Sequence, residues 1–395
     1  MIKQKSWKAE EVISLVPDEL LDNLADETGV DYSVQKLHGK TVFKLFLFAF
    51  LNGGSVSLRI LEAIFKSERF RSLFNVPAKI LKHSAIGMRL HKINYRYFEG
   101  IFTHLVSSPE LDSVLFDRKK INARKIDTTI VTLSSKLLKF GLDDNPGVKT
   151  LKFGVELRAS LPVNVVCYKG QEYLSEDNAL PKLVFGQQQK KALNIAIFDR
   201  GIQRKQNFVN FQKAGIYFIS RLSTQKVKII KYLTVKETET KALTVLSDQI
   251  IRFASNENLK PEDAHTEFRL ITGKNKDTNQ QIAFLTNVYF LSAVEIADLY
   301  KSRWEIETFF KFIKQQLNFS HLLSRSENGI KAVMYLTMIA AVLLTLYKKF
   351  NKIMGWAVAK IKFLDELGGG VIKDWHTEMT PAFAYLKVVP SFNSS

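Results

Sequence analysis

The sequence predicts an α/β fold in which helices flank a mixed β-sheet, with a helical region before the sheet and a β-rich insertion within it. Two observations predict the sheet: β-branched runs begin near Arg124, and apolar strands further on alternate with helical segments. A third observation, the helical spacing of apolar residues in the first hundred positions, predicts the preceding region. At 395 residues the chain is too long for one ordinary core, so we expect several structural units.

The first unit, residues 1–120, is expected to be an all-α domain that binds DNA. After an acidic start, the stretch from Tyr32 to Phe98 has twelve lysines and arginines against two acidic residues. Its apolar spacing predicts several helices, broken at Gly53 and Gly54. Helices with a basic surface bind phosphates whatever the base sequence, and the net charge of +18 also favours a polyanionic partner. The alternative is an ordinary solvated basic surface.

Residues 121–222 are expected to form the first part of the core. The runs "KIDTTIVTLS", "TLKFGVELRA" and "LPVNVVCYKG" predict three strands joined by short turns. A helix, "ALPKLVFGQQQKKAL", then leads to the strand "NIAIF", and a second helix, "KQNFVNFQKAG", leads to a fifth strand, "IYFISRL". Three strands followed by helix, strand, helix and strand indicate a mixed five-stranded sheet covered by helices.

The rest of the chain divides into three segments. Residues 223–290 carry alternating strand patterns between polar turns and are expected to form a β-rich insertion. Residues 291–350 are expected to return to helices and complete the core, and residues 351–395 to form a peripheral segment. The apolar run "VMYLTMIAAVLLTLY" is shorter than the roughly 20 residues that cross a bilayer. It therefore predicts a buried core helix and no membrane partner.

Two aspartates in the predicted sheet are candidates for a functional role. Asp127 lies inside the first strand, where a charged residue interrupts a strand-forming run. Asp199 ends the strand "NIAIF", and functional groups are common at the carboxyl ends of strands in open α/β sheets. Each is a weak indication on its own, because an aspartate at a strand end is often a turn residue or a helix cap.

The segment "YKSRWEIETFFKFIK" places polar side chains on one face of an otherwise apolar helix. Steps of three, four and seven residues confine four of them to an arc of roughly 60°. They are Tyr300, Arg303, Glu307 and Lys314. Glu305 falls well outside this arc. A charged side chain is costly to bury unless it is paired, so a carboxylate between two cations on a buried helix indicates a specific role. The alternative is an ordinary i to i+4 ion pair between Arg303 and Glu307, with Lys314 exposed.

Three carboxylates, Asp127, Asp199 and Glu307, could therefore converge. Hard oxygen ligands of this kind suit Mg²⁺ or Mn²⁺, and two such ions can activate an attacking oxygen and stabilise the leaving oxygen in phosphodiester chemistry. The histidines and the single cysteine, Cys167, have no convincing zinc spacing, and the sequence has no Gly-rich phosphate loop for ATP. A single cysteine fits a reducing compartment, so we expect a cytoplasmic protein.

The spacing of the helix face, Y-x2-R-x3-E-x6-K, resembles the Y-R-E-K signature of the DDE transposases of bacterial insertion sequences, in the group named the insertion-sequence-four family. "IDTTI" around Asp127 and "IFDRG" around Asp199 resemble that family's first and second catalytic aspartate motifs, and they occur in the required order. The resemblance covers roughly residues 120–345. The region before it matches only in its position and its helical, basic character.

The resemblance implies a ribonuclease-H-like core built on the five predicted strands. It also implies that Asp127, Asp199 and Glu307 are the catalytic triad and hold two Mg²⁺ ions, for which Mn²⁺ can substitute. The β-rich stretch then corresponds to an insertion that relatives carry before the helix with the catalytic glutamate. In some relatives a tryptophan of this insertion stacks on a flipped base during hairpin formation, and residues 223–289 contain no tryptophan.

The remaining residues of the helix face are expected to hold DNA. Arg303 suits a bidentate phosphate contact, Lys314 a point-charge contact, and Tyr300 can donate a hydrogen bond to a phosphate. Trp304 and the phenylalanines near it are expected to be packing residues. Glu305, which lies off this face, is expected to be dispensable for cleavage, whereas Glu307 is not.

The function expected from this resemblance is cut-and-paste DNA transposition. Metal-dependent cleavage at the terminal inverted repeats would be followed by attack of the freed 3′ hydroxyl on target DNA. The expected partners are double-stranded DNA and a second copy of the chain when two ends are synapsed, in a bacterial cytoplasm with the nucleoid. Two alternatives remain open: a catalytically silent transposase relic that acts as a sequence-specific DNA-binding protein, and a non-transposing nuclease on the same core.

Overall fold

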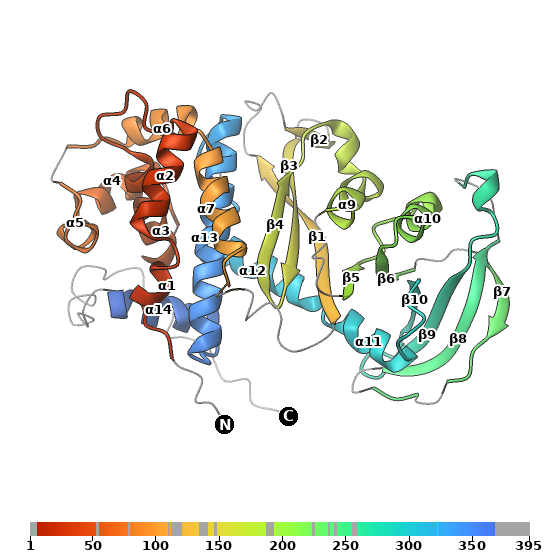
Figure 1. Ribbon diagram of the computed structural model, residues 1–395. Helices are drawn as coiled ribbons and strands as arrows, with labels where there is room; N and C mark the ends of the chain where they lie inside the picture. Colours follow the sequence, from red (N-terminus) through yellow and green to blue (C-terminus); the bar gives the residue numbers. More distant parts are fainter. Residues whose placement is uncertain are drawn as a thin grey trace, which may run out of the picture.

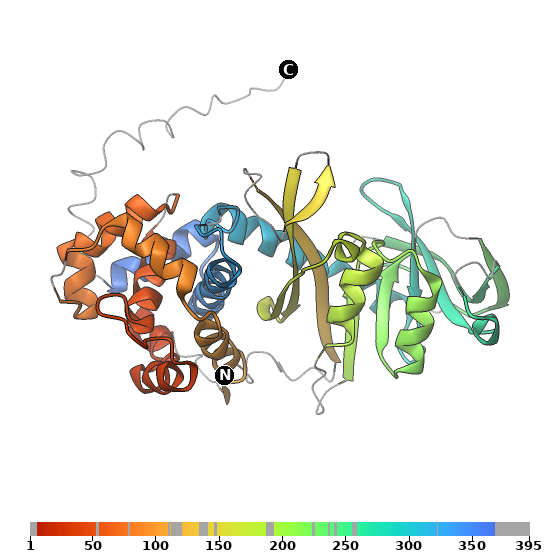
Figure 2. The same ribbon diagram turned by 90° about the horizontal axis from the view of Figure 1, so that it is seen from above.

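The computed structural model describes residues 6–367 with the exception of twelve short stretches. These are 53–54, 78–79, 110, 112–120, 134–140, 146–147, 187–192, 223–225, 236–237, 241–242, 255–258 and 322. The described residues form a group of helices beside one large sheet that carries its own helices (Figure 1). The same arrangement is visible from above, where the strands of the β-rich segment lie at the end of the sheet away from the helical group (Figure 2).

The N-terminal helices pack around one long apolar helix from much later in the chain. This late helix is α13 (Glu327–Phe350), and it lies between the N-terminal helices and strand β4 (Figure 1). α14 (Trp356–Leu367) packs against α13 and α3. The N-terminal helices are α1 (Ala9–Ile13), α2 (Asp18–Thr28), α3 (Gly39–Asn52), α4 (Leu58–Lys66), α5 (Glu68–Phe74), α6 (His83–Lys92) and α7 (Arg96–Val106).

The burial of α13 agrees with the prediction of a core helix. By length and composition this helix could cross a membrane, but 94% of its most apolar window is buried inside the protein. Most side chains of α3 and of α13 are apolar and buried, which is typical of helices that other elements enclose. The segment after residue 350 is therefore partly integral to the helical group, because α14 covers one side of this core.

The five strands predicted from the sequence are all present and neighbour one another in the order β4-β3-β1-β5-β6. β1 is parallel to β5, and β5 is parallel to β6, whereas β3 is antiparallel to both β1 and β4. Their bounds are β1 (Ile121–Leu133), β3 (Val148–Arg158), β4 (Leu161–Cys167), β5 (Leu193–Phe198) and β6 (Tyr217–Arg221).

The sheet is larger than the five strands predicted from the sequence. Within the described residues the sheet has ten strands, because β10 pairs antiparallel with β6 and the sheet continues through β9 and β8 to β7. A last parallel strand leaves one edge of unpaired N–H and C=O groups, and β10 satisfies it. The additional strands are β2 (Leu142–Asn145), β7 (Val227–Tyr232), β8 (Leu243–Phe253), β9 (Phe268–Asn275) and β10 (Gln281–Thr286).

Helices cover both faces of the central strands, and β5 shows the division clearly. Ala196 and Phe198 pack in one apolar cluster with α9 (Glu176–Val184) and α10 (Lys205–Lys213). Ile195 and Ile197 pack in another cluster with α11 (Ala293–Lys301). α12 (Trp304–Gln316) packs against β1. Successive strand residues point to opposite faces, so the residue after Phe198 points toward the α11 side. Short 3₁₀ turns are present at Gln171–Leu174 and Pro261–Asp263.

Candidate active site

Asp127 and Asp199 lie level with each other on neighbouring parallel strands. In the pairing of β1 with β5, Lys125 is opposite Ile197, so two residues further along Asp127 reaches the height of Asp199. The buried side chain of Ile126 faces the α9 and α10 cluster, which turns its neighbour Asp127 toward the opposite face. Both aspartates are therefore directed at the side of the sheet that carries α11 and α12.

The predicted single helix from residue 300 to residue 314 is two helices in the structure. α11 ends at Lys301, Ser302 and Arg303 form a turn, and α12 begins at Trp304. Both turn residues keep right-handed helical backbone angles, so the direction of the side chains changes little. Tyr300 consequently reaches the site from α11, Arg303 from the turn and Glu307 from α12.

The Arg303 guanidinium stands among all three candidate carboxylates. It donates a 2.6 Å hydrogen bond to Glu307 Oε1, and its nitrogens lie 3.8 Å from Asp127 Oδ2 and 4.0 Å from Asp199 Oδ2. Arg303 is only 6% exposed, and its Nε has no hydrogen-bond partner within the described part of the chain. The ion pair that the simple alternative predicted is thus present, but it is one contact of a cluster that includes both aspartates.

Tyr300 and Lys314 contact different parts of the two central strands. The Tyr300 hydroxyl donates a 2.9 Å hydrogen bond to Asp199 Oδ1, and its ring packs on Phe284 with the ring centres 4.8 Å apart. Lys314 donates to the carbonyl oxygen of Ile130 on β1 at 3.3 Å, and burial lowers the pKa of its ammonium group. The structure therefore brings Tyr300, but not Lys314, into contact with the carboxylates.

The environment shifts the pKa values of the two aspartates in opposite directions. Burial raises the pKa of Asp127 to about 6, although the backbone N–H of Thr128 and the Arg303 charge act against the shift. Burial also acts to raise the pKa of Asp199, but the Arg200 backbone N–H, Arg303 and the Tyr300 hydroxyl outweigh it and lower that pKa. Unequal proton affinity in two neighbouring carboxylates is common at functional sites.

The donor set suits a hard divalent cation, but the guanidinium separates the donors. Carboxylate oxygens are the ligands that Mg²⁺ and Mn²⁺ prefer. As the side chains lie here, no three acidic, histidine or cysteine side chains of the described residues are grouped closely enough to hold a metal ion. The arrangement fits such an ion in ligand chemistry and in direction, provided that Arg303 turns away from the carboxylates.

Several residues beside the site were not found from the sequence. Lys125, two residues before Asp127, is 5% exposed and pairs with Glu305 at 3.0 Å. Glu176 at the start of α9 accepts a hydrogen bond from the hydroxyl of Thr128 at 2.6 Å. A lysine in a predicted strand was a signal for the first pair, whereas nothing local in the sequence indicates the second.

The packing role predicted for the aromatic residues of α12 holds for three of four. Phe309, Phe310 and Phe312 are buried, but Trp304 is 66% exposed and cannot be a core residue. It shares one side of α12 with Thr308 and Lys311, which are also exposed, so its ring faces solvent and not the sheet.

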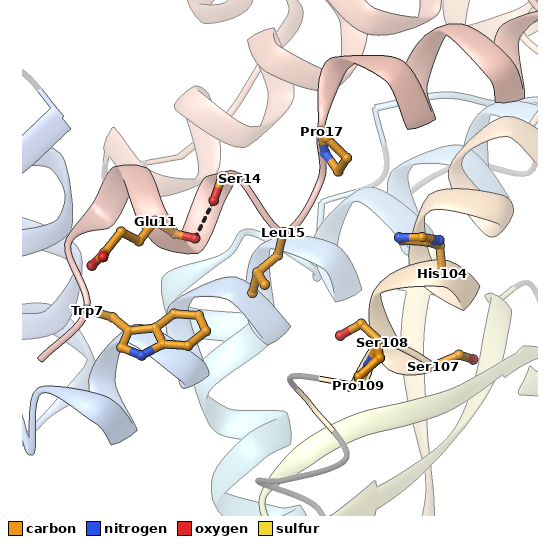
Figure 3. Close-up of a pocket in the computed structure, with 9 residues that line it drawn as sticks. All are labelled: Trp7, Glu11, Ser14, Leu15, Pro17, His104, Ser107, Ser108 and Pro109. Atoms are coloured by element: carbon orange, nitrogen blue, oxygen red, sulfur yellow. Dashed lines mark hydrogen bonds between the residues drawn. The ribbon is translucent and has the colours of Figure 1, made fainter. Parts of the chain in front are cut away.

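A separate cavity lies in the helical group and shares no residue with the carboxylate cluster. It has a volume of about 700 Å³ and opens between the N-terminal segment and the end of α7 (Figure 3). Its walls mix apolar side chains such as Trp7 and Leu15 with polar ones such as His104 and Ser107. Nothing in its lining resembles the convergence of charges at Arg303.

Comparison with known proteins places this chain among transposases. Residues 147–343 match the family described as the transposase DDE domain, a range that includes Asp199 and Glu307 but not Asp127. A protein of Geobacillus stearothermophilus named as a transposase of insertion sequence element IS5377 is 23% identical over 95% of this chain and 94% of its own length.

Two further relatives also carry transposase names. A putative transposase of Sinorhizobium fredii is 32% identical over 40% of this chain and 43% of its own length. A putative transposase for insertion sequence element IS4SA of Synechocystis is 26% identical over 62% of this chain and 67% of its own length. The matched domain is thus that of a transposase. The chain belongs to the DDE transposases and is related to those of insertion sequences.

Proposed function

We propose that this transposase cuts DNA at the ends of an insertion sequence and joins the freed ends to target DNA by a cut-and-paste route. The observation that carries the proposal is the convergence of Asp127, Asp199 and Glu307 on the Arg303 guanidinium. These carboxylates come from β1, the end of β5 and α12. The strand order β4-β3-β1-β5-β6 supports the ribonuclease-H-like core that the DDE family implies.

The three carboxylates are the proposed ligands of two Mg²⁺ ions, which Mn²⁺ could replace, and DDE transposase domains generally use divalent metal ions. Such ions, when bound, promote in-line attack on a phosphodiester by activating the attacking oxygen and stabilising the leaving one. Asp199 and Glu307 lie within the matched domain. The assignment of Asp127 rests on its position level with Asp199 and on its contact with the same guanidinium.

Arg303 and Lys314 are the proposed ligands of DNA phosphates beside the cut. A guanidinium released from the carboxylates could form a bidentate pair with a phosphate, and Lys314 offers a compact positive charge in the last turn of α12. The sequence predicts a phosphate contact for Tyr300 as well. Because its hydroxyl donates to Asp199 Oδ1, we assign Tyr300 the additional role of orienting that carboxylate.

The all-α region before residue 120 is the proposed reader of the terminal inverted repeats. Exposed cations at both ends of α6, Lys82 and Lys92, and Arg96 at the start of α7 support a phosphate-binding surface there. Joining two ends of one element requires that two active sites act together, so we propose a dimer on DNA. The division into a core, a β-rich segment at 223–290 and a later helical part is also a proposal.

The direct test is incubation of the protein with DNA carrying the ends of its own element and Mg²⁺, followed by mapping of cut and joined strands. We expect nicks that leave 3′ hydroxyl ends, then joined products, and loss of both in Asp199→Ala. Asp298→Asn, which alters an exposed carboxylate on α11, is the matched control and should cut normally. Binding without cutting would identify a silent relic, and cutting without joining a nuclease; either outcome contradicts the proposal.

A further inference from the structure

Glu305 connects three elements of the core at a single carboxylate oxygen. Its Oε2 accepts a hydrogen bond from Lys125 Nζ at 3.0 Å and another from Ser160 Oγ at 2.7 Å. Lys125 belongs to β1, Ser160 to the turn between β3 and β4, and Glu305 to the first turn of α12. The oxygen therefore joins the helix that carries Glu307 to the strand that carries Asp127.

Two contacts of opposite polarity join β1 to the start of α12: Lys125 with Glu305, and Asp127 with Arg303. Lys125 and Asp127 are two residues apart on β1 and share one face of the sheet. Arg303 and Glu305 are two residues apart at the start of α12. The strand thus presents a cation and then an anion, and the start of the helix presents the complementary charges.

The burial of Lys125 makes this connection costly to break. Lys125 is 5% exposed, and Glu305 is its only ion-pair partner among the described residues. Loss of Glu305 would leave an ammonium group buried without a counter-charge, and a group in that state moves toward water or toward another carboxylate. Asp127 carries the carboxylate two residues further on the same face of β1.

The turn that carries Ser160 is strained and depends on a partner. Arg158 pairs with Leu161, so Ala159 and Ser160 form a two-residue hairpin loop, and both have positive φ angles, 45° and 67°. Loops of this kind favour glycine or asparagine, because other side chains crowd the backbone in the left-handed region. The Ser160 hydroxyl is held on Glu305, which connects this loop to the catalytic helix.

We propose that Glu305 is a positioning residue that fixes α12 on β1 so that Glu307 faces Asp127 across the site. The inference rests on the proposed function for its catalytic consequence. Glu305 does not contact the carboxylate cluster, so its pair with Lys125 persists when Arg303 leaves for a phosphate. The sequence alone predicts that Glu305 is dispensable for cleavage. Its contacts in the structure lead us to expect slower cleavage when it is lost, because a displacement of a catalytic group such as Glu307 by about 1 Å can lower a rate by about 100-fold.

The test separates position from charge with two substitutions of one residue. Glu305→Ala removes both hydrogen bonds, whereas Glu305→Gln removes the same charge and keeps an oxygen that can accept from Lys125 and Ser160. We expect Glu305→Ala to weaken Mn²⁺ binding without DNA by about 10-fold and to slow single-turnover cleavage by 10- to 100-fold, with the affinity for end DNA unchanged. Glu305→Gln should recover part of both losses, because Lys125 keeps a hydrogen-bond acceptor but loses its counter-charge.

Matched controls address folding and unspecific effects. Thr308→Ala changes an exposed residue of α12 whose hydroxyl donates to the Trp304 carbonyl of the same helix, and it should behave as wild type. Ser160→Gly removes one contact but suits the left-handed backbone, so it should keep the melting temperature while weakening Mn²⁺ binding by about 2- to 3-fold. Equal effects of Glu305→Ala and Glu305→Gln, or wild-type behaviour of both, would overturn the proposal.

Hydrogen exchange of the α12 amides tests the connection without metal or DNA. Exchange should be faster in Glu305→Ala than in wild type, and intermediate in Glu305→Gln. If the wild-type protein neither binds Mn²⁺ nor cuts end DNA, the proposed function fails, and this measurement still decides the inference. Unchanged exchange in Glu305→Ala would then reject the role of Glu305 in holding the helix.

Discussion

Arg303 donates a 2.6 Å hydrogen bond to Glu307, four residues along the same chain segment, while facing an aspartate on each of two neighbouring strands. One guanidinium therefore balances three carboxylates that would repel one another without it. The same three groups are the proposed metal ligands, so Arg303 and a metal ion are alternatives for one position. This relationship leads to the first prediction.

Replacing Arg303 with glutamine should separate metal binding from catalysis. Without the guanidinium the carboxylates lose their internal counter-charge, so Mn²⁺ should bind about 3- to 10-fold more tightly in the absence of DNA. End DNA should bind more weakly and cleavage should fall by at least about 100-fold, because the proposed phosphate contact is lost. Calorimetric Mn²⁺ titration and a cleavage assay measure the two effects.

The control for this experiment is Lys301→Gln, which removes one positive charge from an exposed position at the end of α11. It should leave Mn²⁺ affinity close to the wild-type value. An Arg303→Gln protein that binds Mn²⁺ as weakly as wild type would show that the guanidinium does not compete with the metal.

The hydrogen bond from Tyr300 to Asp199 should affect the reaction more than the stability of the fold. Tyr300→Phe keeps the ring on Phe284 and should cost about 1 kcal/mol in urea unfolding, with cleavage about 10-fold slower. Burial raises the pKa of Tyr300, so the hydroxyl remains a donor and the loss should not vary between pH 6 and 9. Tyr289→Phe, at a half-exposed tyrosine, is the control. A cleavage rate equal to wild type in Tyr300→Phe would show that the Tyr300 hydroxyl does not orient Asp199 for the reaction.

The stability of the protein should rise with pH between about 8 and 10 because of one buried lysine. Lys360 on α14 is 5% exposed and donates to the Gln316 carbonyl at 2.6 Å, and burial lowers its pKa to about 8. Its unfolded pKa is near 10.4, so in this interval the unfolded chain binds the extra proton and raising the pH favours the folded state.

Urea unfolding of wild type and Lys360→Met at pH 7 and pH 10 isolates this contribution. The free energy of unfolding of wild type should increase by up to about 3 kcal/mol relative to the change in Lys360→Met. Other titrating groups affect both proteins alike and cancel in the comparison. Parallel pH dependence in the two proteins would contradict the assignment to Lys360.

Local pattern in the sequence was enough to find the strands and the two aspartates. Asp127 interrupts a strand-forming run, and Asp199 ends a short apolar one. The spacing from Arg303 to Lys314 likewise predicted one helix face. These features depend on neighbours within a few residues, which the sequence displays directly.

Features that depend on distant partners could not be predicted in the same way. The pairing of β10 with β6, which enlarges the sheet, joins segments more than sixty residues apart and leaves no local trace. The exposure of Trp304 depends on which side of α12 packs against the sheet, and the role inferred for Glu305 depends on Lys125, 180 residues earlier. Helix spacing alone separated Glu305 from Glu307 correctly but gave no account of what Glu305 contacts.

The central claim is that Asp127, Asp199 and Glu307 form one metal site, and directed backbone cleavage by bound Fe²⁺ tests it most directly. Fe²⁺ in place of Mg²⁺, with ascorbate and peroxide, generates radicals that cut the chain next to the ion. We predict three sets of fragments, ending near residues 127, 199 and 307, which excess Mg²⁺ suppresses and Asp199→Ala abolishes. Cuts that miss one of these three positions, or that persist unchanged in Asp199→Ala, would contradict the account.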